Sequence, residues 1–204
     1  MTTELGSIQD ARRDMYRAQI IAAAEVEFSR SGYASTKVGA IAQTADLSLA
    51  TVYKHFAGKS EIWDELHTVR MQELLARVEA ERVRTGSVVD RILSSIASVA
   101  RYLTEHPSYL DLNLWTGSGW ASTADSHGVQ QSVWGAGLES ITDGVQHAVD
   151  EGEIRDLKPS VAAGLIVSTL QVFLADWAAS GRVENPESVI AGMVQRMRWM
   201  LVGR

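Results

Sequence analysis

Residues 38–56 read VGAIAQTADLSLATVYKHF, and the spacing of their apolar side chains decides how the N-terminal part of the chain folds. Apolar residues recur every three or four positions on both sides of Ala45-Asp46-Leu47, which predicts two short helices joined by a tight turn. Ile41 of the first helix would pack against Val52 and Phe56 of the second. A helix of this size fits the major groove of DNA. A small hairpin inside an all-helical core would give the same spacing, so both interpretations stay open at this point.

Helical patterns flank this stretch on both sides. The preceding helix is expected from about Met15 to Gly32, a residue that adopts the left-handed conformation in which helices often end. Thr36 and Ser48 are the candidate N-caps of the two short helices. A longer helix is expected to follow, over Lys59–Arg84, with one apolar face.

The remainder of the chain also predicts helices and no strands. Ser87 and Asp90 match a capping box. Three prolines sit at positions typical of a first helical turn, and Gly117–Gly128 is small and polar, as in a loop. Further helices are therefore expected from Ser87, Pro107, Pro159 and Pro186, and another through Trp134. The predicted fold is all-α with about nine helices: an N-terminal three-helix helix-turn-helix domain over residues 14–74 and a larger helical body over residues 75–204.

Composition excludes several classes of protein. The 204 residues contain no cysteine, which excludes disulfide scaffolds, thiolate metal sites and cysteine nucleophiles. The net charge is −6, yet residues 1–60 carry seven basic and six acidic side chains, so a local basic patch remains open. The N-terminus lacks a signal peptide's apolar stretch. The uncharged run Val161–Ala175 is shorter than the ~20 residues that span a bilayer. We therefore expect a soluble, cytoplasmic protein.

The sequence gives little support for an enzyme. The five histidines are scattered, and only His147 and Glu151 have a spacing that suits metal ligands, where a solvated surface pair is the simpler interpretation. We recognise no nucleophile–base arrangement and no phosphate-binding loop. We therefore expect no catalytic site, no metal site and no bound cofactor.

Three segments together resemble the TetR family of bacterial transcriptional regulators. They are IIAAAEVEFSRSGYAST (20–36), VGAIAQTADLSLATVYKHF (38–56) and GKSEIWDEL (58–66), and they correspond to that family's first four helices. The motif that carries the resemblance is Tyr53-x-His55-Phe56-x-x-Lys59, together with Phe28, Gly32, Tyr33 and Thr36. Asp46 and Ala50 differ from the glycines common in the family. Beyond this first third of the chain, only length and helical character agree.

The resemblance implies a DNA-binding surface around the second short helix. It implies that the Tyr53 hydroxyl binds a backbone phosphate, although a half-buried packing tyrosine is the alternative. Lys59 lies in a first helical turn, where a phosphate would relieve its repulsion from the helix dipole; an ion pair with Asp64 or Glu61 is the alternative. Phosphate contacts are expected nearer residues 36–37 and base contacts nearer residues 49–54. The expected DNA-binding set is Thr36, Lys37, Ser48, Leu49, Ala50, Thr51, Tyr53, Lys54, His55 and Lys59.

The resemblance also implies an effector cavity in the helical body. Aromatic side chains suit a mostly apolar ligand, with Asp111, Asn113 or Asp176 as polar anchors, although ordinary core packing explains the same side chains. The expected ligand-binding set is Met71, Leu74, Trp115, Trp120, Trp134 and Trp177.

The last two helices are expected to form a homodimer. The helix over residues 159–180 is apolar nearly all round, and the helix over residues 186–202 follows it, so a partner surface is needed unless both merely complete a monomeric core. Together the patterns predict a sequence-specific DNA-binding regulator, a repressor released from a palindromic operator by a small, mostly apolar ligand. The alternative is a helical ligand-binding protein without DNA binding.

Overall fold

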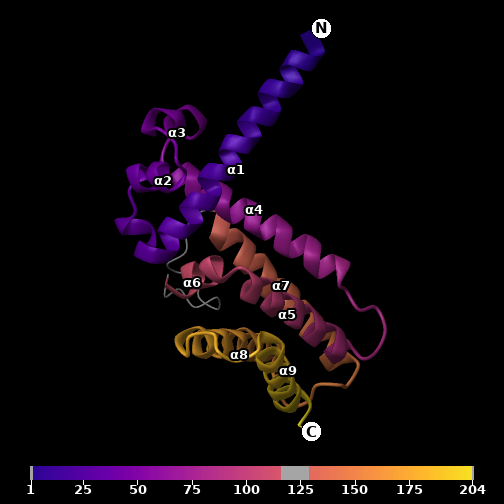
Figure 1. Ribbon diagram of the computed structural model, residues 1–204. Helices are drawn as coiled ribbons and strands as arrows, with labels where there is room; N and C mark the ends of the chain where they lie inside the picture. The colour runs from indigo at the N-terminus through magenta and orange to yellow at the C-terminus, as the bar shows by residue number, and fades with distance from the viewer. Residues whose placement is uncertain (1, 116–128, 204) are drawn as a thin grey trace. The chain divides into compact units, whose positions relative to one another are not determined.

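The protein is all-helical in residues 2–115 and 129–203, which the computed structural model describes (Figure 1). The chain divides into two compact units, an N-terminal unit, Met1–Arg70, and a C-terminal unit, Met71–Arg204. Nine helices occupy the described residues. They are α1 (Thr2–Ser35), α2 (Val38–Thr44), α3 (Leu49–His55), α4 (Lys59–Ala80), α5 (Val88–Glu105), α6 (Pro107–Trp115), α7 (Val129–Asp150), α8 (Pro159–Ala179) and α9 (Pro186–Val202).

Helix α1 begins at Thr2, so the expected start near Met15 was wrong. The side chains of residues 8–15 are exposed, so no buried apolar stripe marks this part of the helix in the sequence. Once the buried turns around Ile20 and Phe28 are formed, extending the helix costs little free energy, because each added residue contributes a hydrogen bond. Helix-forming side chains therefore extend α1 toward the N-terminus. The N-terminal half of α1 extends beyond α3 in Figure 1.

The end of α1 bears out one expectation in part and corrects another. Gly32 has the expected positive φ, +71°, but its ψ of 164° lies outside the left-handed helical region, so it kinks α1, which continues to Ser35. Tyr33 folds back so that its ring lies 5.8 Å from that of Phe28. Thr36 does not cap α2: the N-cap is Lys37, which makes no side-chain capping bond. The Thr36 hydroxyl instead donates to the Gly32 carbonyl at 2.8 Å, because Thr36 lies buried against the end of α1.

Helices α2 and α3 pack as the apolar spacing predicts. Ile41, Val52 and Phe56 are fully or almost fully buried. The Ser48 hydroxyl caps α3 by accepting a hydrogen bond from the Thr51 amide at 3.0 Å. The turn between the helices has φ +51° at Asp46, the left-handed conformation that a glycine adopts more readily.

In the C-terminal unit α5 packs against α7 and α9, and α8 packs against α7 and α9. The predicted capping box of Ser87 and Asp90 opens α5, and Asn185 caps α9 by accepting from the Glu187 amide. Helix α4 ends at Ala80, a few residues earlier than expected. The predicted loop over residues 117–128 lies outside the described residues.

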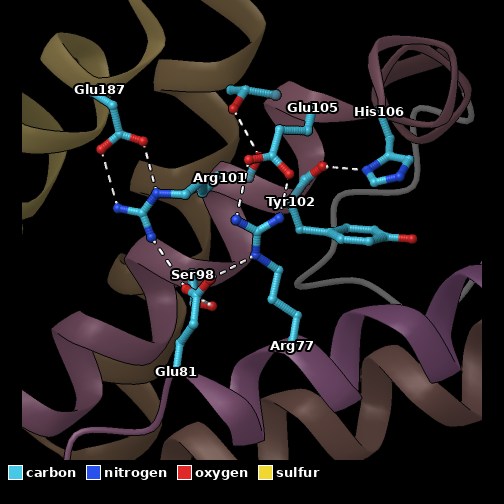
Figure 2. Close-up of polar contacts among 9 residues, drawn as sticks. Arg77, Glu81, Ser98, Arg101, Tyr102, Glu105, His106 and Glu187 are labelled. Atoms are coloured by element: carbon cyan, nitrogen blue, oxygen red, sulfur yellow. Dashed lines mark hydrogen bonds and ion pairs between the residues drawn. The ribbon is translucent and has the colours of Figure 1, made fainter.

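A polar network fastens the residues of α4 that follow Met71 to α5 and α9 (Figure 2). Arg77 of α4 pairs with Glu81, the residue directly after that helix, at 2.8 Å and with Glu105 on α5. Arg101 of α5 pairs with Glu81 at 3.2 Å and, through two bonds of 2.7 and 3.1 Å, with Glu187 of α9. We call these five side chains the α4–α5–α9 network. Hydrogen bonding, first from the buried Ser98 hydroxyl, holds the pKa of Glu81 below its usual value.

Helix α8 combines a buried face with exposed apolar side chains. Ile166, Leu170 and Leu174 are buried, whereas Val161 and Val172 are exposed. By length and composition α8 is the one helix among the described residues that could cross a membrane, a test that the core helix of a soluble protein also passes.

The first prediction concerns His67, which is buried edge-on against Trp63 with ring centroids 4.5 Å apart. Burial lowers its pKa from 6.5 to about 4. Between these values the unfolded chain binds a proton more readily, so the free energy of unfolding falls as pH decreases. We expect a loss of about 2 kcal/mol from about pH 7.5 to about pH 5, measured by urea denaturation. The variant His67→Phe should lose most of this dependence, and an unchanged dependence would contradict the assignment.

Candidate nucleic-acid interface

Helix α3 buries one face and exposes the other. Val52 is buried, whereas Leu49 is 46% and Tyr53 is 52% exposed, and Ala50 and Lys54 are exposed as well. Thr51 is half-buried, and its hydroxyl lies 2.7 Å from that of Ser48 within the cap. The expected DNA-facing side chains of α3 therefore share one outer surface.

Two side chains of α1 hold the ends of the short helices. Arg17 donates to the His55 carbonyl at the end of α3 at 2.6 Å, and its guanidinium lies over the Phe56 ring. Gln19 donates to the Ala45 carbonyl at the end of α2, also at 2.6 Å. The last carbonyls of a helix lack partners within it, so these bonds fix how both helices lie against α1. Neither residue is predicted from the sequence, because no local pattern signals contacts 26 to 38 positions away.

Lys59 occupies a position that the sequence analysis did not foresee. Its ammonium donates to the carbonyls of Tyr33, Ala34 and Thr36 at 2.7, 3.1 and 3.1 Å. An ammonium has three donors, so these bonds use all of them. The end of α1 thus supplies the negative partner that was expected from a phosphate, or from Asp64 or Glu61. We call this arrangement the Lys59 clamp.

The two other residues expected at the start of α2 differ in accessibility. Thr36 is buried, with its hydroxyl bonded to α1, whereas Lys37 is exposed. A direct phosphate contact is therefore sterically open to Lys37. For Thr36 and Lys59 such a contact stays a prediction that would require exchanging bonds already made.

The imidazole of His55 lies among cations. Its ring centroid is 5.3 Å from that of Tyr16. Partial burial lowers the pKa of His55, and the charges of Lys54, Arg17 and Arg13 lower it further. The outer edge of α3 is therefore a place where positive charge accumulates and an anion would be favoured.

The expected ligand-binding residues are only partly described. Met71, Leu74 and Trp177 are buried, and the Trp177 indole donates to the Glu184 carbonyl at 2.9 Å. Trp120 and the side chains of Trp115 and Trp134 lie outside the described residues. The described part of the expected set is thus apolar and enclosed.

The candidate polar anchors have protein contacts of their own. Asp111 forms an ion pair with Arg182, and the Asn113 amide donates to the Tyr109 carbonyl at 2.6 Å. Asp176 is exposed. His147 and Glu151 are exposed too, and within the described ranges no three histidine or acidic side chains are grouped to hold a metal ion.

Residues 20–66 match the family model described as bacterial regulatory proteins, tetR family. The chain is 20% identical over 176 residues to the uncharacterized HTH-type transcriptional regulator YhgD of Bacillus subtilis, covering 86% of this chain and 91% of that protein. It is 26% identical over 163 residues to the HTH-type transcriptional repressor SCO4008 of Streptomyces coelicolor, covering 79% and 77%.

The fold has solved counterparts. The transcriptional regulator FadR from Bacillus subtilis, solved in complex with stearoyl-CoA, matches with a TM-score of 0.71 at 17% identity, over 88% of this chain and 96% of that chain. This likeness concerns the all-helical fold. The helix-turn-helix geometry of α2 and α3 and the match over residues 20–66 lead to one assignment: this N-terminal segment is a helix-turn-helix region like that of the bacterial regulatory proteins of the tetR family.

Proposed function

We propose that this chain is a cytoplasmic, dimeric repressor that binds a palindromic operator through α3 and is released by a mostly apolar ligand. The observation that carries the proposal is the outer face of α3, where Leu49, Tyr53 and Lys54 are exposed beside accumulated positive charge. Residues 14–74 form the DNA-binding domain in this proposal, and residues 75–204 bind the effector and the second protomer.

The side chains divide into three roles at the DNA. Lys37 and Tyr53 bind backbone phosphates, because both are exposed at the rim of the helix-turn-helix. Lys54 and Thr51 read base edges, and Leu49 with Ala50 contacts thymine methyl groups or sugars. Ser48 shapes the start of α3, and His55 lies at its end. Thr36 and Lys59 position the surface from beneath through their bonds to α1.

The second prediction separates phosphate contacts from base contacts. Lys37→Ala and Tyr53→Phe should each weaken binding by about tenfold on every operator variant, because phosphates carry no sequence information. Lys54→Ala should instead relax the preference at one base pair of each half-site. Binding is measured on a duplex selected from a random pool by the unmodified protein and on its single-base variants.

Arg30→Ala is the matched control, since Arg30 is exposed on α1 and pairs with Glu27 at 3.2 Å, away from α3. Base-specific effects of Tyr53→Phe would contradict its role at a phosphate. If the unmodified protein selects no duplex, the alternative of a ligand-binding protein without DNA binding is favoured.

The dimer proposal rests on the uncovered faces of α8 and α9. Val161, Leu165 and Val172 form an exposed apolar stripe on α8, and Trp199 and Val202 are exposed on α9. Ser168 and Ala179 fall on the same exposed face of α8, where small side chains allow a second helix to approach closely. A two-fold axis beside these helices would bury both stripes in one isologous interface.

The third prediction tests this interface with Val172→Glu. Val172 is 64% exposed in the protomer, so the change should leave the fold intact while placing an unpaired charge in the interface. We expect the dimer dissociation constant to rise at least about 100-fold and operator binding to be lost with it. Leu170 and Met197 do not serve this purpose, because they are buried within the protomer's own core.

Val183→Glu is the matched control, because Val183 is 87% exposed between α8 and α9 and lies on neither helix. Sedimentation velocity measures the oligomeric state. A stable folded monomer of the unmodified chain at micromolar concentration would overturn the dimer.

The effector proposal rests on the apolar character of the C-terminal unit and on the stearoyl-CoA complex of the FadR regulator with the same fold. Met71, Leu74 and Trp177 are buried apolar side chains of this unit. A ligand releases DNA only if it binds more tightly to a conformation whose recognition helices do not fit the operator.

The fourth prediction uses stearoyl-CoA as the probe. We expect it to quench tryptophan fluorescence and to weaken operator binding by about tenfold, within the range of measured coupling energies. Coenzyme A without an acyl chain is the control and should do neither, because the apolar chain supplies the binding free energy. Equal effects of both compounds would contradict an apolar effector site, and so would the absence of any effect of the acyl compound.

A further inference from the structure

A groove separates the N-terminal half of α1 from α3. Its volume is about 610 Å³. Arg12, Arg13 and Tyr16 line it from α1, and Lys54 and His55 line it from α3. Gln9 and Thr51 complete the lining. The arginines come from the part of α1 that the sequence analysis left outside the first helix, so this surface was not among the predicted sites.

The charges around the groove are unevenly balanced. Arg12 contacts the Tyr16 hydroxyl at 3.3 Å, and among the described residues no carboxylate lies within 4 Å of Arg12 or Lys54. Arg13 lies 3.9 Å from Asp10 and 3.7 Å from Asp14, whose side chains are 68% and 70% exposed. Such exposed pairs contribute little free energy, so a phosphate can take the place of these carboxylates at Arg13.

The inner wall of the groove is held in place. Arg17 binds the His55 carbonyl and pairs with Glu65 of α4 at 3.3 Å and, less closely, with Glu61 at 3.9 Å. Its charge is thus shared with two carboxylates, whereas those of Arg12 and Lys54 face the open space. The residues that line the groove thus include three cationic side chains, two aromatic rings and no acidic side chain, which suits a small, fully exposed anion such as a phosphodiester.

We propose that this groove holds a backbone phosphate of the operator, beside the bases that α3 reads, with Arg12 and Arg13 as its cationic ligands. The inference rests on the proposed DNA binding by α3. A duplex against the outer face of α3 brings its sugar–phosphate strands to the edges of that helix, and the groove lies at one of these edges. The N-terminal half of α1 then acts as an arm that adds affinity without adding sequence preference.

The test compares the unmodified protein with Arg12→Ala/Arg13→Ala on a duplex that the unmodified protein selects from a random pool. The double variant should lose one phosphate contact in each of two protomers. The slope of the logarithm of the DNA association constant against the logarithm of salt concentration should therefore become shallower by about 2. Base preference should not change. Arg30→Ala is the control, because it removes an equally exposed arginine of α1 from outside the groove.

A second measurement locates the phosphate. Single methylphosphonate linkages, which are neutral, are placed at each position of the duplex. In each half-site, one linkage should weaken binding of the unmodified protein by about tenfold and leave binding of the double variant unchanged. A double variant with the original salt slope, or with the original response at every linkage, overturns the groove assignment alone. Failure of the unmodified protein to select any duplex overturns the proposed function as well.

Discussion

The Lys59 clamp is the contact on which the proposed DNA-binding surface depends. Helices α2 and α3 have seven residues each, too few to be stable in water without tertiary contacts. The ends of α1, α2 and α3 all receive a side-chain donor from another helix: Lys59 of α4 for α1, and Gln19 and Arg17 of α1 for the other two. The outer face of α3 is therefore oriented by carbonyl contacts made on its inner side.

The contacts that the sequence predicted lie within one helix or between the two consecutive short helices α2 and α3. Ser48 and the Ser87–Asp90 capping box each act on their own helix. Two predictions were wrong: that α1 starts near Met15 and that Thr36 caps α2. Both features depend on residues that lie nearby in space. The same holds for Lys59, whose carbonyl partners are 23 to 26 positions away. The sequence could suggest a charged partner for it without showing which one.

The α4–α5–α9 network joins three helices through charged side chains that are partly exposed. Arg101 of α5 links the C-terminal end of α4 to α9, since it pairs at once with Glu81, which directly follows α4, and with Glu187. A bidentate pair is directional, so a shift of one helix along another loses two hydrogen bonds together. Under the proposed function, an effector that moves this part of α4 must exchange these bonds for others. The network would then favour two discrete positions of this part of α4 relative to α5 and α9 over a continuous range of positions.

Asp46 has a consequence for how such a regulator can change over generations. Its left-handed backbone costs about 1 kcal/mol in a residue with a side chain, and a glycine there would lose a comparable amount through the greater freedom of its unfolded chain. Exchange between the two is thus close to neutral for folding. It does remove a negative charge from an exposed turn next to the proposed DNA surface. Under the proposed function, substitution at this one position could change the affinity for DNA, and with it the extent of repression, while the operator sequence stays the same.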